Sequence, residues 1–232
     1  MNYSLAVAST AEGHYSRNGS LIVKTLTNYH DEEEIFATQQ LRYEVFCERL
    51  KWLPPNNEKR EWDQYDMYAI HFAAFSNGHG LVGYSRIIQY SKVGFMLEKD
   101  FAKILGKETL VIDKKSSIEI SRLCLKPGVK NPKKISEGLY KAMYQWSFIN
   151  RKRYWYIVVE KKYLAGLLRQ SFPFRQIGPG FEFEPGTLSV AAVLDLDELD
   201  ETLGIKRPQF MLWLGETHLE WEDSPDFEID AG

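Results

Sequence analysis

One short segment of the sequence places a carboxylate, a hydroxyl and a guanidinium among aliphatic residues. The segment Ile118–Leu125 reads IEISRLCL and has the aliphatic and β-branched content of a strand. Side chains alternate between the two faces of a strand, yet the two isoleucines share one parity and the two leucines share the other. The sequence therefore predicts either burial on both faces or a β-bulge near Ser121–Arg122.

A bulge at this point has chemical consequences. It lets Glu119 and Arg122 lean toward the same region, which strict alternation forbids, and it frees backbone N–H groups that can hold an oxyanion. We therefore place Glu119, Ser121 and Arg122 in the candidate catalytic set. The alternative, a structural Glu/Arg pair on a sheet face, stays open at this point.

A second set of charged and aromatic residues is a candidate substrate site. Arg42 and Phe46 are four residues apart and so share one face of a predicted helix. Two acids and two arginines of this set, together with Arg122, form a candidate ion-pair network, because buried arginine is tolerated only when it is paired. The network is either purely structural or orders a lid over a substrate with an amino group and a carboxylate. The set comprises Arg42, Phe46, Trp52, Asp63, Asp66 and Arg86.

The bulk properties exclude several classes of protein. The chain has 232 residues, which suits one large domain, and its net charge of −3 argues against a basic nucleic-acid binder. Its two cysteines are far apart and its five histidines are scattered, so we expect no disulfide framework and no metal site. No apolar run is long enough to span a membrane, and the first residues lack the pattern of a secretory signal. These features together predict a cytoplasmic protein without a membrane span.

The order of predicted elements indicates an α/β (α+β) fold with one mixed, mostly antiparallel sheet flanked by helices. The helix that carries Arg42 should begin with a capping box at Asp31 and Glu34. Residues 117–159 read as a strand, a helix and a parallel strand. Predicted strands are 20–26, 68–75, 81–89, 117–125, 154–159, 174–178 and 187–196; predicted helices are 31–50, 95–105, 135–150 and 162–170, with a turn or more of helix at 208–214. The domain limits follow as a lead-in 1–19, a domain 20–215 and an acidic tail 216–232.

The segment Lys126–Arg153 is strongly basic and contains a single acid, Glu137. A solvated basic face is the alternative to a docking surface for an acidic partner. Its first part reads KPGVKNPKK, where coenzyme-A-dependent acetyltransferases have a glycine-rich turn that cradles a pyrophosphate. One glycine, two prolines and four lysines suit a carrier protein with a single phosphate better. The candidate docking residues are Lys126, Lys130, Lys133, Lys134, Arg151 and Arg153.

Five motifs in order resemble the acyl-homoserine lactone synthase (autoinducer synthase) family. They are RYEVFCERLKW, EWDQYD, GYSRII, FMLEKDFAKIL and EISRLCL, between Leu41 and Leu125. The resemblance implies an N-acetyltransferase-like (GNAT) fold with splayed central strands. It also implies two substrates, S-adenosylmethionine and an acyl carrier protein that presents an acyl-phosphopantetheine thioester, with no tightly bound cofactor.

The resemblance also assigns roles to single residues. Glu119 matches the family's general base, and the arginines and aspartates named above match its charged cluster. Phe46, Trp52 and Phe101 match the aromatic residues around the substrates.

The sequence departs from the family in one stretch, and two alternatives stay open. QYSKVGFML lacks the threonine and proline that the family usually has before the Met-Leu pair. The motifs YAIHFAAF and ISRLCL also resemble a sister group, the exosortase-associated N-acyltransferases, and more loosely the N-acyl amino acid synthases. The first alternative is therefore an enzyme that acylates an amino acid or another amine without forming a lactone. The second is a non-catalytic module that binds the acyl chain or its carrier.

Overall fold

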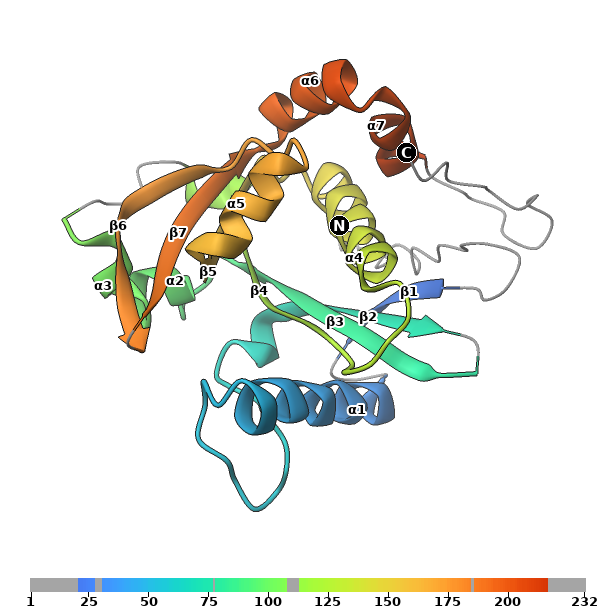
Figure 1. The fold of residues 1–232 in the computed structure, drawn as a ribbon, viewed down its shortest axis with the longest axis vertical. Helices are drawn as coiled ribbons and strands as arrows, with labels where there is room; N and C mark the ends of the chain where they lie inside the picture. Colours follow the sequence, from blue (N-terminus) through green and yellow to red (C-terminus); the bar gives the residue numbers. More distant parts are fainter. Residues whose placement is uncertain (1–20, 28–30, 77, 108–112, 185, 217–232) are drawn as a thin grey trace, which may run out of the picture.

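The protein is built on a single seven-stranded sheet with strand order β1-β2-β3-β4-β5-β7-β6 (Figure 1). The computed structural model describes residues 21–27, 31–76, 78–107, 113–184 and 186–216. Only β4 and β5 pair in parallel, and every other neighbouring pair is antiparallel, so the predicted mixed, mostly antiparallel sheet is confirmed. The strands are β1 Leu21–Leu26, β2 Ala69–Ser76, β3 Gly80–Gln89, β4 Ser117–Leu125, β5 Tyr154–Glu160, β6 Arg175–Glu184 and β7 Thr187–Asp195.

Helices cover both faces of the sheet (Figure 1). One face packs against α4, α5, α6 and α7, and together they bury the largest hydrophobic cluster. The other face packs against α1 at the β3–β4 side and against the short helices α2 and α3 at the β5–β7 side. The helices are α1 Glu32–Tyr43, α2 Met96–Lys99, α3 Ala102–Leu105, α4 Pro132–Ile149, α5 Lys161–Arg169, α6 Leu196–Lys206 and α7 Pro208–Gly215.

Most predicted elements are present, and four predictions differ. The single helix predicted at 95–105 is divided into α2 and α3. The capping box at Asp31 is wrong, because its carboxylate accepts from the backbone N–H of Thr27 at 2.8 Å and caps no helical N–H. The helix α6 was not predicted, although three of its leucines are buried on the core side and Asp195 accepts from Asp197 N at its start. Strand β6 is longer than predicted, since the Gly-Pro-Gly at 178–180 is absorbed as an irregularity in its register with β7.

The predicted β-bulge is confirmed in β4. Tyr84 of β3 pairs with Cys124 and Arg86 pairs with Ser121, so two residues of β4 lie opposite the one residue between them. Arg122 adopts a left-handed conformation there, with φ of 57°. The extra residue restores the apolar phase: both isoleucines and both leucines of β4 pack in the cluster beneath α4. Glu119 and Ser121 consequently face the side on which α1 and α2 lie.

The two central strands diverge just before the bulge. Ser117–Ile120 of β4 pairs with Tyr154–Ile157 of β5. Beyond these residues β4 continues only along β3, and β5 continues only along β7. The splayed central strands implied by the family resemblance are thus confirmed.

The predicted lead-in 1–19 lies outside the described residues, as does the tail apart from Glu216. The helices of the described part of the chain include none with the length and apolar character that a membrane span needs.

A glycine at the contact between α3 and β6 offers a test of this packing. Gly178 has φ of +68°, and a Cβ there would lie 2.7 Å from the carbonyl oxygens of Ile104 and Leu105. We expect Gly178→Ala to lower the free energy of unfolding by about 2 kcal/mol or more, because it adds a strained backbone to a clash with backbone atoms. Urea unfolding measures the change.

The matched control is Gly204→Ala in α6, where a Cβ meets nothing within 4 Å. That variant should gain roughly 0.5–1 kcal/mol of helix stability. Equal effects of the two substitutions would contradict the packing described for α3.

Candidate active site

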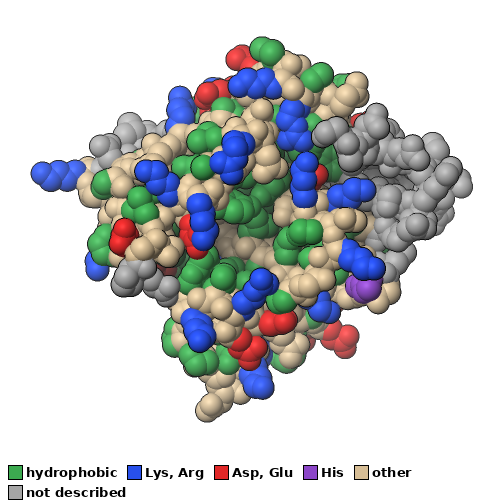
Figure 2. Space-filling view, viewed as in Figure 1, with side chains coloured by type: hydrophobic (Ala, Val, Ile, Leu, Met, Phe, Trp, Pro, Cys, Tyr) green, Lys and Arg blue, Asp and Glu red, His purple; other side chains and the backbone are tan. Residues whose placement is uncertain are grey.

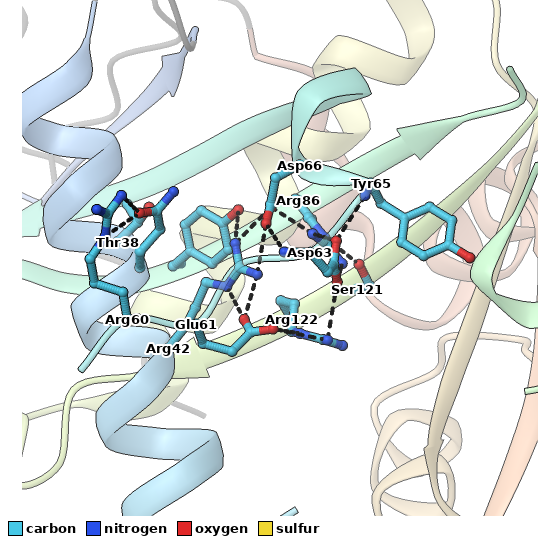
Figure 3. A network of polar contacts seen from close by, with 12 residues as sticks. Thr38, Arg42, Arg60, Glu61, Asp63, Tyr65, Asp66, Arg86, Ser121 and Arg122 are labelled. Carbon is cyan, nitrogen blue, oxygen red and sulfur yellow. Dashed lines mark hydrogen bonds and ion pairs between the residues drawn. The ribbon is translucent and has the colours of Figure 1, made fainter. Parts of the chain in front are cut away.

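Three arginines and three carboxylates form one continuous ion-pair network on the face that carries Glu119 and Ser121 (Figure 3). The arginines come from α1, β3 and β4, whereas the carboxylates come from the loop between the π-helical turn Glu44–Arg49 and β2. The members are Arg42, Glu61, Asp63, Asp66, Arg86 and Arg122. Equal numbers of opposite charges explain how so many ionised groups are tolerated away from water.

Arg42 anchors the network to α1 and is fully buried. Its Nε donates to Glu61 Oε2 at 2.5 Å, and its two terminal nitrogens donate to the two oxygens of Asp66 at 2.7 and 3.1 Å. The fork on Asp66 is the bidentate geometry in which an Arg–carboxylate pair is strongest. This contact ties α1 to the loop.

Arg86 holds both aspartates of the loop and reaches the bulge. It donates to Asp63 Oδ1 and Oδ2, each at 2.7 Å, and to Asp66 Oδ1 at 2.6 Å. Its Nε donates to the Ser121 hydroxyl oxygen at 2.9 Å. Burial alone would raise the pKa of Asp66, but Arg42 and Arg86 outweigh burial and hold it well below its usual range. Asp63 shows the same balance, with hydrogen bonds from Arg86 as the largest opposing effect, so its pKa is also lowered.

Arg122 closes the network at its more exposed end. Its guanidinium donates to Glu61 Oε1 at 3.1 and 3.2 Å and to Asp63 Oδ2 at 3.1 Å. The partners of Arg122 are therefore the loop acids, and the alternative of a structural Glu119/Arg122 pair is wrong. The left-handed backbone at Arg122 aims its side chain at the loop.

Glu119 lies apart from these pairs in an apolar environment. It is 1% exposed, and its Oε2 accepts from the backbone N–H of Leu97 at 3.2 Å. Burial raises the pKa of Glu119 to about 8, opposed by that N–H and by the charge of Arg86. Arg86 is the network arginine that lowers this pKa, and the expected place of Arg122 beside Glu119 is wrong.

Two buried residues, His71 and Tyr84, pack beside Arg42 and Asp66. The His71 ring nitrogens lie 2.6 Å from the Tyr84 hydroxyl and 3.0 Å from the Asp66 carbonyl oxygen. Burial lowers the pKa of His71 to about 4, so the ring is neutral at physiological pH. Sequence reasoning missed His71, Tyr84 and Glu61. The signals were a histidine inside the apolar strand YAIHFAAF and a third acid in EWDQYD.

The predicted aromatic residues divide between two places. The rings of Phe46 and Trp52 stack with centroids 6.0 Å apart, and Arg122 lies 5.7 Å from the centre of the Phe46 ring. Trp52 is 46% exposed, so this pair forms an open edge of the network. Phe101 instead packs with the α2–α3 cluster and meets Phe183 edge to face.

The face that carries α4 and α5 is hollowed at its centre, and the visible wall of the hollow is mainly hydrophobic with lysines and arginines around it (Figure 2). The turn between β4 and α4 carries the exposed Lys126 and Lys130, and the first turn of α4 carries the exposed Lys133 and the less exposed Lys134. This part of the predicted docking surface is accessible.

The other half of the predicted docking set lies elsewhere. Arg151 and Arg153 follow the far end of α4, and 18 helical residues span about 27 Å. Arg153 is paired with Asp195 and Asp197, each at 2.8 Å. The prediction of one basic surface that includes Arg153 is therefore wrong, because adjacent acids already neutralise that arginine.

Sequence comparisons with known proteins match the region of the chain that contains this site. A family profile described as an acetyltransferase (GNAT) domain matches residues 41–138, which contain the whole ion-pair network and Glu119. The acyl-homoserine-lactone synthase of Vibrio anguillarum is 39% identical over 69 residues, which are 29% of this chain and 35% of that protein. The synthase of Pseudomonas fluorescens is 37% identical over 62 residues, 25% of this chain and 32% of that protein. The aligned part of this chain thus spans about a third of each relative.

Solved structures extend the likeness to most of the chain. The acyl-homoserine lactone (AHL) synthase LasI gives a TM-score of 0.65 at 20% identity, covering 78% of this chain and 91% of LasI. BjaI, a CoA-dependent acyl-homoserine lactone synthase solved with SAM and isopentyl-CoA, gives 0.70 at 18% identity, covering 90% and 96%. The fold is that of the acyl-homoserine-lactone synthases. The N-acyl amino acid synthase FeeM gives a TM-score of 0.51 at 16% identity, covering 80% and 95%.

The resemblance read from the motifs is therefore confirmed, and the matched acetyltransferase profile covers the part of the chain that carries the ion-pair network. The profile match begins one residue before Arg42 and includes β3 and β4.

The raised pKa of Glu119 makes stability depend on pH. The unfolded glutamate ionises near its ordinary pKa, whereas the folded one keeps its proton until about pH 8. Between these values the native state binds one proton more, so the free energy of unfolding falls as pH rises and levels off above about pH 8. We expect the wild type to lose more stability than Glu119→Gln between pH 5 and pH 9 in urea unfolding. Parallel curves for the two proteins would show that Glu119 is ionised throughout.

Proposed function

We propose that this chain is an acyltransferase that moves a fatty acyl group from a thioester to the amine of S-adenosylmethionine and releases an acyl-homoserine lactone. The observation that carries the proposal is the buried Glu119, with its raised pKa, at the base of the opening between β4 and β5. A general base needs a pKa near the working pH, and this is the described carboxylate that meets that condition.

The donor side of the site is the hollow on the α4–α5 face. Its hydrophobic wall suits an acyl chain (Figure 2), and the ladder between β4 and β5 ends one residue beyond Glu119. We infer that the donor is an acyl carrier protein docked on Lys126, Lys130, Lys133 and Lys134. The start of α4 is Pro132, which lacks an N–H, so this helix end offers fewer backbone donors to a pyrophosphate than a glycine-rich turn would. BjaI, by contrast, is described as CoA-dependent.

The acceptor side is the edge of the ion-pair network. Arg122, Phe46 and Trp52 form its open part, and they combine a guanidinium with two aromatic faces. A guanidinium binds a carboxylate, and aromatic faces attract a sulfonium cation. S-adenosylmethionine carries both groups together with the amine that is acylated. We assign Arg42, Asp63, Asp66 and Arg86 the role of fixing this surface, and Phe101 a contact with the substrate from the α2–α3 cluster.

The chemistry follows from this arrangement. Glu119 takes a proton from the acceptor nitrogen, and the nitrogen attacks the thioester carbonyl carbon. Backbone N–H groups at the bulge of β4 donate to the oxyanion of the tetrahedral intermediate, which then expels the thiol and leaves an amide. The carboxylate of the acylated S-adenosylmethionine next displaces methylthioadenosine at the γ-carbon and closes the lactone. Ser121, held by Arg86, keeps the bulge in register for these N–H groups.

A second candidate acts on a different acceptor. The likeness to FeeM favours an N-acyltransferase that acylates an amino acid and forms no lactone. Its TM-score of 0.51 is below the 0.65 and 0.70 found for the two lactone synthases, so we rank it second. Both reactions use the donor side in the same way. We place the enzyme in the cytoplasm, where acyl carriers and S-adenosylmethionine are made.

The decisive experiment is a thiol-release assay with acyl carrier protein and acyl-CoA thioesters, each with and without S-adenosylmethionine. We expect release that depends on S-adenosylmethionine, with methylthioadenosine and an acyl lactone detected by mass spectrometry. Release that needs an amino acid instead would support the second candidate. Binding of the thioester without release in any combination would leave a non-catalytic acyl-binding module.

The same assay tests the base. Glu119→Gln should lose roughly 10²–10⁴-fold in turnover, because the amide accepts no proton. In the wild type, kcat/KM should rise with pH and level off above about pH 8, since the base works only when it is ionised. A near-normal rate for Glu119→Gln in a folded protein would remove Glu119 from the mechanism.

A charge-reversal series tests the carrier. Lys130→Glu and Lys133→Glu should raise KM for the acyl carrier protein thioester and reduce its dependence on ionic strength, because they remove attraction for an acidic partner. The matched control is Arg151→Glu, at the far end of α4. Equal effects of the three substitutions would contradict docking at the turn between β4 and α4.

A further inference from the structure

The hydroxyls of Tyr140 and Tyr163 join two helices on the hollowed face of the molecule. Tyr140 belongs to α4 and Tyr163 to the first turn of α5, and their oxygens form a hydrogen bond of 2.5 Å. Both helices lie on the face that is hollowed (Figure 1 and Figure 2). Two oxygens at this separation leave no space for a chain between them. A molecule that lies between α4 and α5 therefore stops at this tyrosine bridge or passes between it and the sheet.

The tyrosine bridge lies near the ends of β4 and β5, beyond the point where the two strands separate. Tyr163 comes three residues after the last residue of β5. Tyr140 directly follows Leu139, and a Cβ built on Gly83 would meet Leu125 at 2.9 Å and Leu139 at 3.4 Å. The helix α4 thus passes over the end of β4 at this position. The bridge connects the β4 side of the opening with the β5 side.

The sheet near the bridge presents apolar side chains that are only half-buried. On the α4 side, Ile120 and Ile157 are buried at the last ladder pair of β4 and β5. Beyond that pair, Leu123, Leu125 and Val159 pack against the same hydrophobic cluster, yet each is half-buried. The opening therefore has the last ladder pair, next to the proposed base, at its narrow end. At its wide end it has the lysine-bearing turn that follows β4.

The tyrosine bridge offers one O–H group that the bridge itself does not use. Each phenol carries one proton, and only one of the two protons lies between the hydroxyls. The bonded pair is exposed, so the second proton is accessible. We infer that this O–H donates to an amide carbonyl oxygen of the pantetheine arm that carries the acyl group. The inference rests on the acyl-transfer function proposed above.

The pantetheine arm has the chemistry that this opening suits. The arm is common to acyl carrier proteins and coenzyme A, and it joins methylene and dimethyl groups through two amides. Its apolar groups match the half-buried leucines and valine of the diverging strands. Each amide that leaves water needs a hydrogen-bond partner. The bridge supplies such a donor on a face whose hollow has a mainly hydrophobic wall.

The position of the bridge selects the outer of the two amides. The thioester carbon must lie near Glu119, whose neighbour Ile120 is the last residue of β4 paired with β5. From Ile157 to the end of β5 at Glu160 the strand advances by three residues, about 10 Å. In an extended arm the inner amide lies close to the sulfur, whereas the outer amide lies about 10 Å away, the length of roughly three extended residues. The outer amide is thus the one that reaches the bridge.

Tyr144 provides a matched control on the same helix. It lies one turn beyond Tyr140, and its hydroxyl donates to Asp200 Oδ1 at 2.8 Å. Tyr144→Phe therefore removes one hydrogen bond between α4 and α6 and leaves the bridge intact. The double variant Tyr140→Phe/Tyr163→Phe removes both hydroxyls of the bridge. It keeps both rings, including the edge-to-face contact of residue 140 with Phe172.

The binding test uses two non-cleavable thioethers that carry the same long acyl chain. One is built on pantetheine, and the other on N-acetylcysteamine, which ends at the inner amide. By isothermal titration, the double variant should bind the pantetheine compound about three- to tenfold more weakly than the wild type, the effect of one lost hydrogen bond. It should bind the N-acetylcysteamine compound unchanged, and Tyr144→Phe should bind both as the wild type does. Equal losses for the two compounds, or no loss for either, overturn the inference.

The kinetic test asks whether the arm or its carrier is recognised. In the thiol-release assay the double variant should raise KM by the same factor for acyl carrier protein and acyl-CoA thioesters, with kcat unchanged. A rise for one carrier alone would place the contact on the carrier and refute the subsite.

The titration needs neither acceptor nor turnover, so it separates this inference from the proposed function. A weaker pantetheine complex in the double variant, together with failure of every acceptor, refutes the function and supports the subsite. Unchanged binding in the double variant, together with lactone formation by the wild type, refutes the subsite alone.

Discussion

The structure of the site depends on the requirement that a buried charge be paired. Arg42 and Arg86 are both fully buried, and removing one partner of such a pair typically costs about 3–5 kcal/mol. Asp66 serves both arginines at once, and Glu61 and Asp63 extend the pairing to Arg122. The loop between α1 and β2 has little regular structure, so these contacts define its position.

The β-bulge in β4 allows Arg122 to join this network. Without the extra residue the apolar side chains beyond Ser121 would turn away from α4, and Arg122 would have no fixed relation to the loop acids. With it, Arg122 joins the network while the leucines stay in the core beneath α4. The ladder between β4 and β5 stops at the residue before the bulge begins. One insertion thus accounts for the position of Arg122, and it coincides with the divergence of the strands.

Much of this arrangement was accessible from the sequence because it rests on local patterns. The change of parity in IEISRLCL predicted the bulge, and the clustering of arginines with aspartates predicted ion pairs. The partners within the network were less accessible, because they depend on which loop residue reaches which guanidinium. Glu61 was missed for that reason, and Arg122 was placed beside Glu119 when its partners are Glu61 and Asp63. Basic residues lie at both ends of α4, and the helix separates them in space. The charge of the segment suggested one basic surface, but Arg153 at the far end is paired with Asp195.

The network and Glu119 show how one protein keeps neighbouring carboxylates in different states. Asp63 and Asp66 are mostly buried, yet each accepts several charge-assisted hydrogen bonds, and so each stays ionised. Glu119 is buried as well, but the groups that donate to it are backbone N–H groups of Leu97 and Met96, and Arg86, which lowers its pKa, is hydrogen-bonded to the aspartates. The difference lies in the charge of the donors, since desolvation acts on all three. The arginines of the network are paired with the loop acids, so at Glu119 desolvation outweighs the charge of Arg86 and the pKa stays raised.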